Sequence, residues 1–203
     1  MDFKKSEKEL YSPKVSPSIV DVPEFVFIAV DGNGDPNTSK EYQRAIEILY
    51  GLSYAIKMGN KSILEYVVAP LEGFWSYGKA YSVHNLFDKS EFSWTSVIRQ
   101  PEFVAEEIFL TAKAAVAKKK PALDLTKARL VKVKEGLCVQ AIHTGPFDSE
   151  PETIEMMDRY ATENGYVIDL NQKRRHHEIY LSDFRKTSPE NLKTIIRHPV
   201  RRA

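Results

Sequence analysis

The chain has 203 residues, of which 42% are hydrophobic and 28% are charged, a balance typical of a folded domain with a buried core. Its length suits one domain or a tightly fused pair. The 29 Lys and Arg residues nearly cancel the 28 Asp and Glu residues, which leaves a net charge of +1. A chain so nearly neutral has no global field to attract nucleic acid or an anionic membrane, so we expect neither as a partner.

The cysteine content points to a reducing compartment. The single cysteine, Cys138, excludes an internal disulfide and any multi-cysteine metal site. The N-terminus mixes charges without an apolar segment behind it, and no apolar run approaches the roughly 18 residues of a membrane span. We therefore expect a soluble, cytoplasmic protein.

The first elements in chain order are an arm, a strand and a helix. Residues 1–22 are rich in Lys, Glu, Ser and Pro without a sustained period, and they predict an N-terminal arm on the surface. In the run Phe25–Val30 odd and even positions are both apolar, which predicts a strand covered on both faces. Thr38 and Glu41 then form a capping box, and apolar residues at helical spacing predict a helix that ends near Lys57.

Two strands and a connecting helix follow. The runs Leu64–Leu71 and Phe92–Arg99 predict strands that complete a first half. Residues 102–120 begin with glutamates and end with lysines, the distribution that the helix dipole favours. This segment is therefore expected to be a helix that joins two halves of the chain.

The second half repeats the order strand, helix, strand, strand. Leu137–His143 predicts the first strand, and a capping box at Ser149 and Glu152 starts a helix that ends near residue 164. Glu178–Phe184 and Lys193–Val200 predict the last two strands.

The closing strands of the two halves share a phrase, TSVIRQP at Thr95–Pro101 and TIIRHP at Thr194–Pro199. This similarity predicts an internal duplication, with two tandem β-α-β-β repeats at about 23–101 and 128–200 inside one domain, 23–203. The expected fold class is therefore α+β with pseudo-twofold symmetry. A groove between two like halves is concave and suits a small-molecule ligand.

Aromatic residues on or beside the predicted strands are numerous enough to line such a groove and to stack on a flat ligand. They are Tyr66, Phe74, Trp75, Tyr77, Tyr81, Phe92, Trp94 and Tyr180. Ordinary core packing explains any single ring equally well.

Glu178 is the candidate for chemistry. In a strand it shares a face with Tyr180 and Ser182, and a carboxylate beside aromatic walls is able to hold a cation or activate water. The alternative is a glutamate at the rim, paired with one of the basic residues at 173–175. The two interpretations are equally compatible with the spacing.

Metal and cofactor chemistry find little support in the sequence. His176 and Glu178 share a strand face, but no third ligand accompanies them, so no metal is expected. The chain also lacks the motifs of phosphate-binding loops, zinc proteases and serine hydrolases. We expect no cofactor.

Three phrases resemble the family of GyrI-like small-molecule-binding domains: APLEGFW at Ala69–Trp75, IHTGPF at Ile142–Phe147 and HEIYLSD at His177–Asp183. The resemblance extends from about Val22 to Val200. It implies two SHS2-like β-α-β-β units with a groove between them, in agreement with the duplication read from the residues.

The resemblance also implies a function. Members fused to a DNA-binding helix-turn-helix sense cationic aromatic drugs, but no such domain fits before Phe25, so this chain looks like a stand-alone member. Some stand-alone members are cyclopropanoid cyclopropyl hydrolases, which add water to DNA-alkylating compounds of the yatakemycin and duocarmycin type. A hydrolase of this kind, with no obligatory protein partner, is the expected function.

The resemblance implies a role for individual residues at the matching positions. Glu178 would orient or deprotonate the water, and Tyr66 would fix that water or donate toward the developing oxyanion. The rings predicted to stack on or surround the ligand are Phe74, Trp75, Trp94 and Tyr180, and His143 would close one end. Relatives often have a second aromatic residue where this chain has Ser76, which leaves the breadth of the pocket open.

Two other functions stay open. The first is a non-catalytic binder that sequesters cationic lipophilic molecules, with Glu178 as the counter-ion. The second is a protein that inhibits a topoisomerase, which follows from the family name and fold analogy alone.

Overall fold

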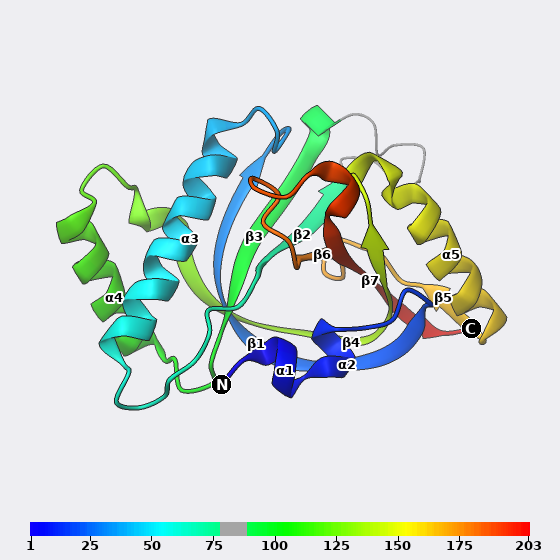
Figure 1. Cartoon of the computed structure of the whole chain (residues 1–203), viewed down its shortest axis with the longest axis horizontal. Coiled ribbons are helices and arrows are strands. Elements are labelled where there is room, and N and C mark those ends of the chain that lie inside the picture. The colour runs from blue at the N-terminus through cyan, green and yellow to red at the C-terminus, as the bar shows by residue number, and fades with distance from the viewer. Residues whose placement is uncertain (78–88) are drawn as a thin grey trace.

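The computed structural model describes residues 1–77 and 89–203. Its strands are β1 (Ser18–Asn33), β2 (Leu71–Tyr77), β3 (Phe92–Gln100), β4 (Ala128–Thr144), β5 (Tyr166–Ile168), β6 (His176–Tyr180) and β7 (Lys193–Arg202). Six of them pair edge to edge in the antiparallel order β4-β1-β3-β2-β6-β7. A further pairing of β4 with β7 closes them into a barrel, and β5 adds to β7 (Figure 1).

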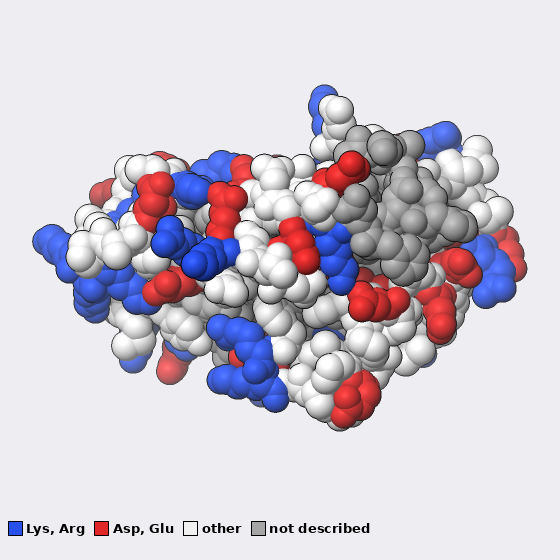
Figure 2. All heavy atoms as spheres, turned by 90° about the horizontal axis from the view of Figure 1, so that it is seen from above, with Lys and Arg blue, Asp and Glu red and all other residues white. Residues whose placement is uncertain are grey.

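Five α-helices accompany the barrel within the described residues: α1 (Phe3–Ser6), α2 (Lys8–Tyr11), α3 (Lys40–Gly59), α4 (Glu106–Lys119) and α5 (Glu150–Glu163). Helices α3 and α5 flank the barrel on opposite sides, and α4 packs against α3 (Figure 1). No helix in the described ranges has the length and apolar character that crossing a membrane requires. Acidic and basic side chains are interspersed over the described part of the face in Figure 2.

The mixed helix and sheet class is confirmed, and both halves show one pairing order. In the first half β1 pairs with β3 and β3 with β2, while in the second half β4 pairs with β7 and β7 with β6. The halves join twice, through β1 with β4 and through β2 with β6. These two strand pairings bring residues that are far apart in the sequence onto one continuous sheet surface.

Some predicted boundaries are wrong. Residues 64–70 have no regular structure, and the strand expected there begins at Leu71. Pairing with β3 and β6 selects Leu71–Tyr77 because those residues find partners on both sides. The strand expected at Glu178–Phe184 is β6 and ends at Tyr180. The predicted N-cap of α3, Thr38, is also wrong by one residue. Ser39 caps this helix, because its side chain accepts a hydrogen bond from the Tyr42 amide.

The N-terminal segment is largely exposed, as expected of a surface arm, but some of its side chains anchor it in the core. Phe3, Leu10 and Tyr11 are buried. Arg99 of β3 donates to both carboxylate oxygens of Glu7, at 2.6 and 2.9 Å, and its guanidinium lies 3.3 Å from the centre of the Phe25 ring. Short polar segments carry no period, so only these tertiary partners reveal their burial.

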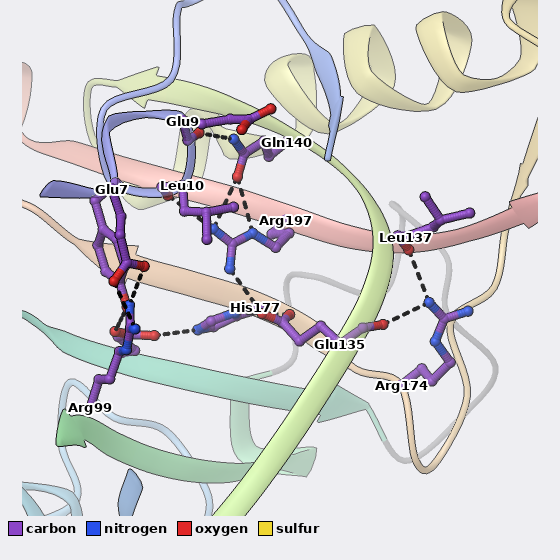
Figure 3. A network of polar contacts seen from close by, with 12 residues as sticks. Glu7, Glu9, Leu10, Arg99, Glu135, Leu137, Gln140, Arg174, His177 and Arg197 are labelled. Carbon is purple, nitrogen blue, oxygen red and sulfur yellow. Dashed lines mark hydrogen bonds and ion pairs between the residues drawn. The ribbon is translucent and has the colours of Figure 1, made fainter. Parts of the chain in front are cut away.

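The barrel interior holds a network of charged side chains (Figure 3). His177 of β6 contacts Glu72 of β2 and Glu135 of β4, each at 3.0 Å. Arg197 of β7 donates to Glu135 at 2.8 Å and to Gln140 at 3.0 Å. Since β6 and β4 are not neighbours in the sheet, the contact between His177 and Glu135 crosses the inside of the barrel. Such buried charges are tolerated only when each has partners.

The network gives stability a defined dependence on acid. Burial alone would raise the pKa of Glu135, but His177 and Arg197 lower it from 4.5 to about 2. A depressed folded-state pKa contributes stability that is present above the unfolded value and is lost as pH falls through the folded one. We expect the stability advantage of the wild type over Glu135→Gln to shrink between about pH 4.5 and pH 2. Urea unfolding at stepped pH measures this, and a constant difference would contradict it.

Candidate functional site

A cavity of about 430 Å³ lies between α3 and α5, within the size range of small-molecule pockets. Both halves of the chain contribute to its wall. The wall includes Tyr42 and Ile46 of α3, Trp75 of β2, Phe147 in the turn before α5, Glu150 at the start of α5, and Glu178 and Tyr180 of β6. The lining combines aromatic rings with polar and charged side chains, and the carboxyl groups of Glu150 and Glu178 lie close together.

The carboxyl group of Glu178 is held by hydrogen bonds with two neighbours on its own strand. Its Oε2 accepts from the Tyr180 hydroxyl at 2.7 Å, and its Oε1 lies 2.9 Å from Nε2 of His176. Alternation along β6 puts these three side chains on one face, as the sequence predicted. The glutamate side chain is only 11% exposed, so the alternative of a rim glutamate is wrong. Arg174, one of its proposed partners there, pairs with Asp169 instead.

A glycine lets the aromatic wall form. Gly73 is the cross-strand partner of Glu178. A Cβ at that position would lie 2.7 Å from Nε1 of Trp75 and 3.1 Å from the hydroxyl of Tyr180, so only glycine leaves room for the indole. With that space, Trp75 Nε1 donates to the Tyr180 oxygen at 3.1 Å. A chain from Trp75 through Tyr180 therefore fixes the carboxylate of Glu178.

A second carboxyl group, Glu150, meets Glu178 from the first turn of α5. Glu150 is 7% exposed, and its Oε1 has no hydrogen-bond partner among the described residues. Burial, and then the charge of Glu178, raise the pKa of Glu150 well above its usual range. The site therefore favours the protonated form of Glu150 next to the Glu178 carboxyl.

Glu150, His176 and Glu178 also form a group of potential metal-ligating side chains within the described ranges, with their ligand atoms inside 4.8 Å of one another. Nε2 of His176 and both oxygens of Glu178 already serve hydrogen bonds between protein groups. The arrangement has the chemistry of a hydrogen-bonded acid pair with a histidine.

Three of the predicted site residues, Glu178, Trp75 and Tyr180, come together in this cavity. Phe74 points the other way, into the barrel, where it stacks on His177 with ring centres 4.1 Å apart. Adjacent residues of a strand face opposite sides, so Phe74 and Trp75 do not share a pocket.

Phe92, another ring predicted at the groove, lines the cavity, whereas two further predicted site residues, Trp94 and His143, do not. Trp94 covers Gly32 and meets Tyr42 edge-on behind the pocket. The ring of His143 contacts Thr153 at 2.8 Å and Ser149 at 3.2 Å, which ties β4 to the start of α5.

Tyr66 does not reach the ligand cavity. Its ring packs edge-on against Phe103, and its hydroxyl has no partner in the described part of the chain. Burial raises the pKa of Tyr66 to about 12. Tyr81, another ring expected at the groove, lies outside the described residues.

Sequence reasoning missed Tyr42, Phe147 and Glu150. Tyr42 lies on the apolar face of α3 and its ring centre is 6.0 Å from that of Trp75. Phe147 meets Tyr180 edge-on. The expected duplication was the signal that could have found them. It places the first turns of the two flanking helices, one in each half, beside the same groove.

Solved structures give close matches. An uncharacterized conserved protein from Listeria innocua is 44% identical, with a TM-score of 0.93, and the match covers 99% of this chain and 100% of the other. Two proteins described as hydrolases from the same organism are 42% and 45% identical, each with a TM-score of 0.90. These matches cover 99% of this chain and 100% and 99% of the hydrolases.

A more distant solved structure shares the fold, and a domain match over most of the chain identifies the family. The C-terminal domain of EcmrR, at 14% identity and a TM-score of 0.56, shares the fold over 92% of this chain and 98% of its own. A comparison with curated proteins gave no match. The GyrI-like small molecule binding domain matches residues 16–201. This match spans both halves, the barrel and the cavity between α3 and α5, and the chain belongs to the family of GyrI-like small-molecule-binding domains.

Proposed function

We propose that this protein binds flat aromatic molecules in the cavity between α3 and α5 and hydrolyses those that carry a strained, electrophilic ring, of which the cyclopropanoids are the expected class. The observation that carries the proposal is the carboxyl group of Glu178, buried among aromatic side chains and held by Tyr180 and His176. Relatives at 42–45% identity that are described as hydrolases support it.

The proposed step needs a general base and a binding surface for a planar ring system. Water attacks the least hindered carbon of a spiro-cyclopropyl dienone, and the bond from that carbon to the ring junction breaks. Its electron pair moves into the dienone, whose carbonyl oxygen becomes a phenolate, while the proton of the water passes to Glu178. Trp75 and Tyr180 orient the planar ring system beside this carboxylate, which raises the frequency of productive attack.

The experiment is chromatographic turnover of a spiro-cyclopropyl dienone by the purified protein. We expect many equivalents of the hydroxyethyl phenol product for each equivalent of protein, above a control without protein. A single equivalent of complex without product would overturn the hydrolase proposal.

The Glu178 carboxyl, which lies among aromatic rings, favours a second candidate function, a non-catalytic binder of lipophilic cations. A carboxylate in such a place attracts a cation directly, and the ring faces add to the attraction. Under this proposal a planar aromatic cation binds at least about 10-fold more tightly than a neutral analogue of the same shape. Fluorescence titration of the protein with each compound measures the two affinities, and equal affinities would exclude the cation binder.

The matching pairing orders of the two halves support one further point of architecture. We propose that β1-α3-β2-β3 and β4-α5-β6-β7 are duplicated SHS2-like units, at about 23–101 and 128–200, joined by the segment of α4. The cavity between α3 and α5 then lies where equivalent parts of the two units meet.

A further inference from the structure

A second cavity, of about 230 Å³, adjoins the first cavity, whose wall includes Glu178. The two cavities have four wall residues in common: Ile46 of α3, Tyr180 of β6, and Phe184 and Arg185 in the segment after β6. Cavities that share a wall lie side by side. The second cavity therefore continues the site along α3, toward later turns of that helix.

Aromatic rings form a continuous line from the first cavity into the second. Phe184 meets both Phe147 and Tyr180 edge-on, with ring centres 6.3 and 6.0 Å apart. Tyr50 and Tyr54 of α3, which line the second cavity, stack on each other with ring centres 6.3 Å apart. Their spacing of four residues puts both rings on one face of the helix. Each cavity therefore offers rings on which a planar group stacks.

The second cavity keeps apolar surface in contact with water. Tyr54 and Val67, which both line it, are 52% and 50% exposed. A ligand that covers these side chains removes apolar area from solvent, which favours binding. The shared wall is partly open as well, because Phe184 is half-buried and Arg185 is exposed. A ligand that extends from the first cavity therefore has a route at the surface, past these two residues.

A turn after β6 holds the shared wall in place. The carbonyl of Asp183 accepts from the amides of Lys186 and Thr187, each at 2.9 Å. Its carboxylate accepts from Nε and Nη2 of Arg185, at 2.8 and 3.0 Å. These bonds constrain the backbone on both sides of Phe184, so the wall is formed without a ligand. Binding across a preformed wall loses less conformational entropy than binding that has to order it.

We propose that the second cavity is a subsite of the same binding site, and that the protein prefers elongated ligands in which a short linker joins two planar units. One unit lies in the first cavity, and the linker crosses the wall at Phe184 and Arg185. The second unit lies against Tyr50 and Tyr54, where stacking and burial add affinity. This rests on the proposed function, which supplies the planar ligand of the first cavity.

Two neutral probes test the subsite by fluorescence titration of the whole chain. One is naphthalene carboxamide, with a single planar unit, and the other is the bis-naphthyl amide, in which the same amide joins two such units. We expect the wild type to bind one equivalent of either probe, and the two-unit probe at least about 10-fold more tightly.

Two variants locate the second unit. Tyr54→Ala removes a ring from the second cavity, and Val67→Glu places a hydrated charge on its wall. Both positions are about half exposed, so the fold tolerates the changes. Each variant is expected to lose most of the gain for the two-unit probe and to keep the affinity for the one-unit probe. Leu110→Ala, which removes an exposed apolar side chain of α4 outside both cavity walls, is the matched control and keeps both affinities.

The outcomes separate the subsite from the proposed function. A gain that persists in both variants would place the second unit inside the first cavity and overturn the subsite. Equal affinities of the wild type for the two probes would also overturn it, as would two bound equivalents of the one-unit probe, because the second cavity would then be an independent site. Failure to bind either probe would overturn the proposed binding of flat aromatic molecules and, with it, the subsite.

Discussion

Glu178→Gln is expected to lower the turnover of a spiro-cyclopropyl dienone by at least about 100-fold while the protein stays folded. The amide keeps the volume of the carboxyl between Tyr180 and His176, but it has no charge and takes no proton from water. Single-turnover and steady-state rates, measured with chromatographic product detection, test this. Ligand affinity by fluorescence titration separates loss of chemistry from loss of binding.

The comparison needs a carboxyl that is remote from the cavity. Glu155→Gln removes one exposed carboxylate from α5 and is expected to keep wild-type rates. Turnover by Glu178→Gln within a few fold of the wild type would remove Glu178 as the base. Equal loss in both variants would point to a change in the net charge of the protein.

Arg197→Met is expected to lower the free energy of unfolding by about 3–5 kcal/mol. Arg197 is 2% exposed and donates to Glu135, to Gln140 and to the Leu10 carbonyl, which joins β7, β4 and the N-terminal helix α2. Methionine fills the space but leaves a charged carboxylate without its arginine and a carbonyl without its donor. Urea unfolding at neutral pH gives the free energy.

An exposed ion pair provides the control. Arg129 pairs with Asp31 across β4 and β1, and both side chains are close to half exposed. Arg129→Met is expected to cost no more than about 1 kcal/mol because water screens this pair. Similar losses in the two variants would show that the barrel network adds nothing to stability beyond an ordinary surface contact.

The residues by themselves determined most elements and one face of the site. Helical spacing located α3, a capping pattern located α5, and apolar runs located β1, β3, β4 and β7 to within several residues at most of their ends. The period of two along β6 placed Glu178 beside His176 and Tyr180, because alternation of side chains is a local property of an extended chain. For the same reason, the neighbours Phe74 and Trp75 face opposite sides of β2.

Only the tertiary structure decided what faces these residues. Glu150 reaches Glu178, and Tyr42 reaches Trp75, because the pairing of β2 with β6 joins the halves and brings the first turns of α3 and α5 to one cavity. The N-terminal helices are anchored to the core because Arg99 and Arg197 bind groups of this segment there. Local spacing carries no information on such contacts, since they depend on strand register and on partners more than 90 positions away in the chain.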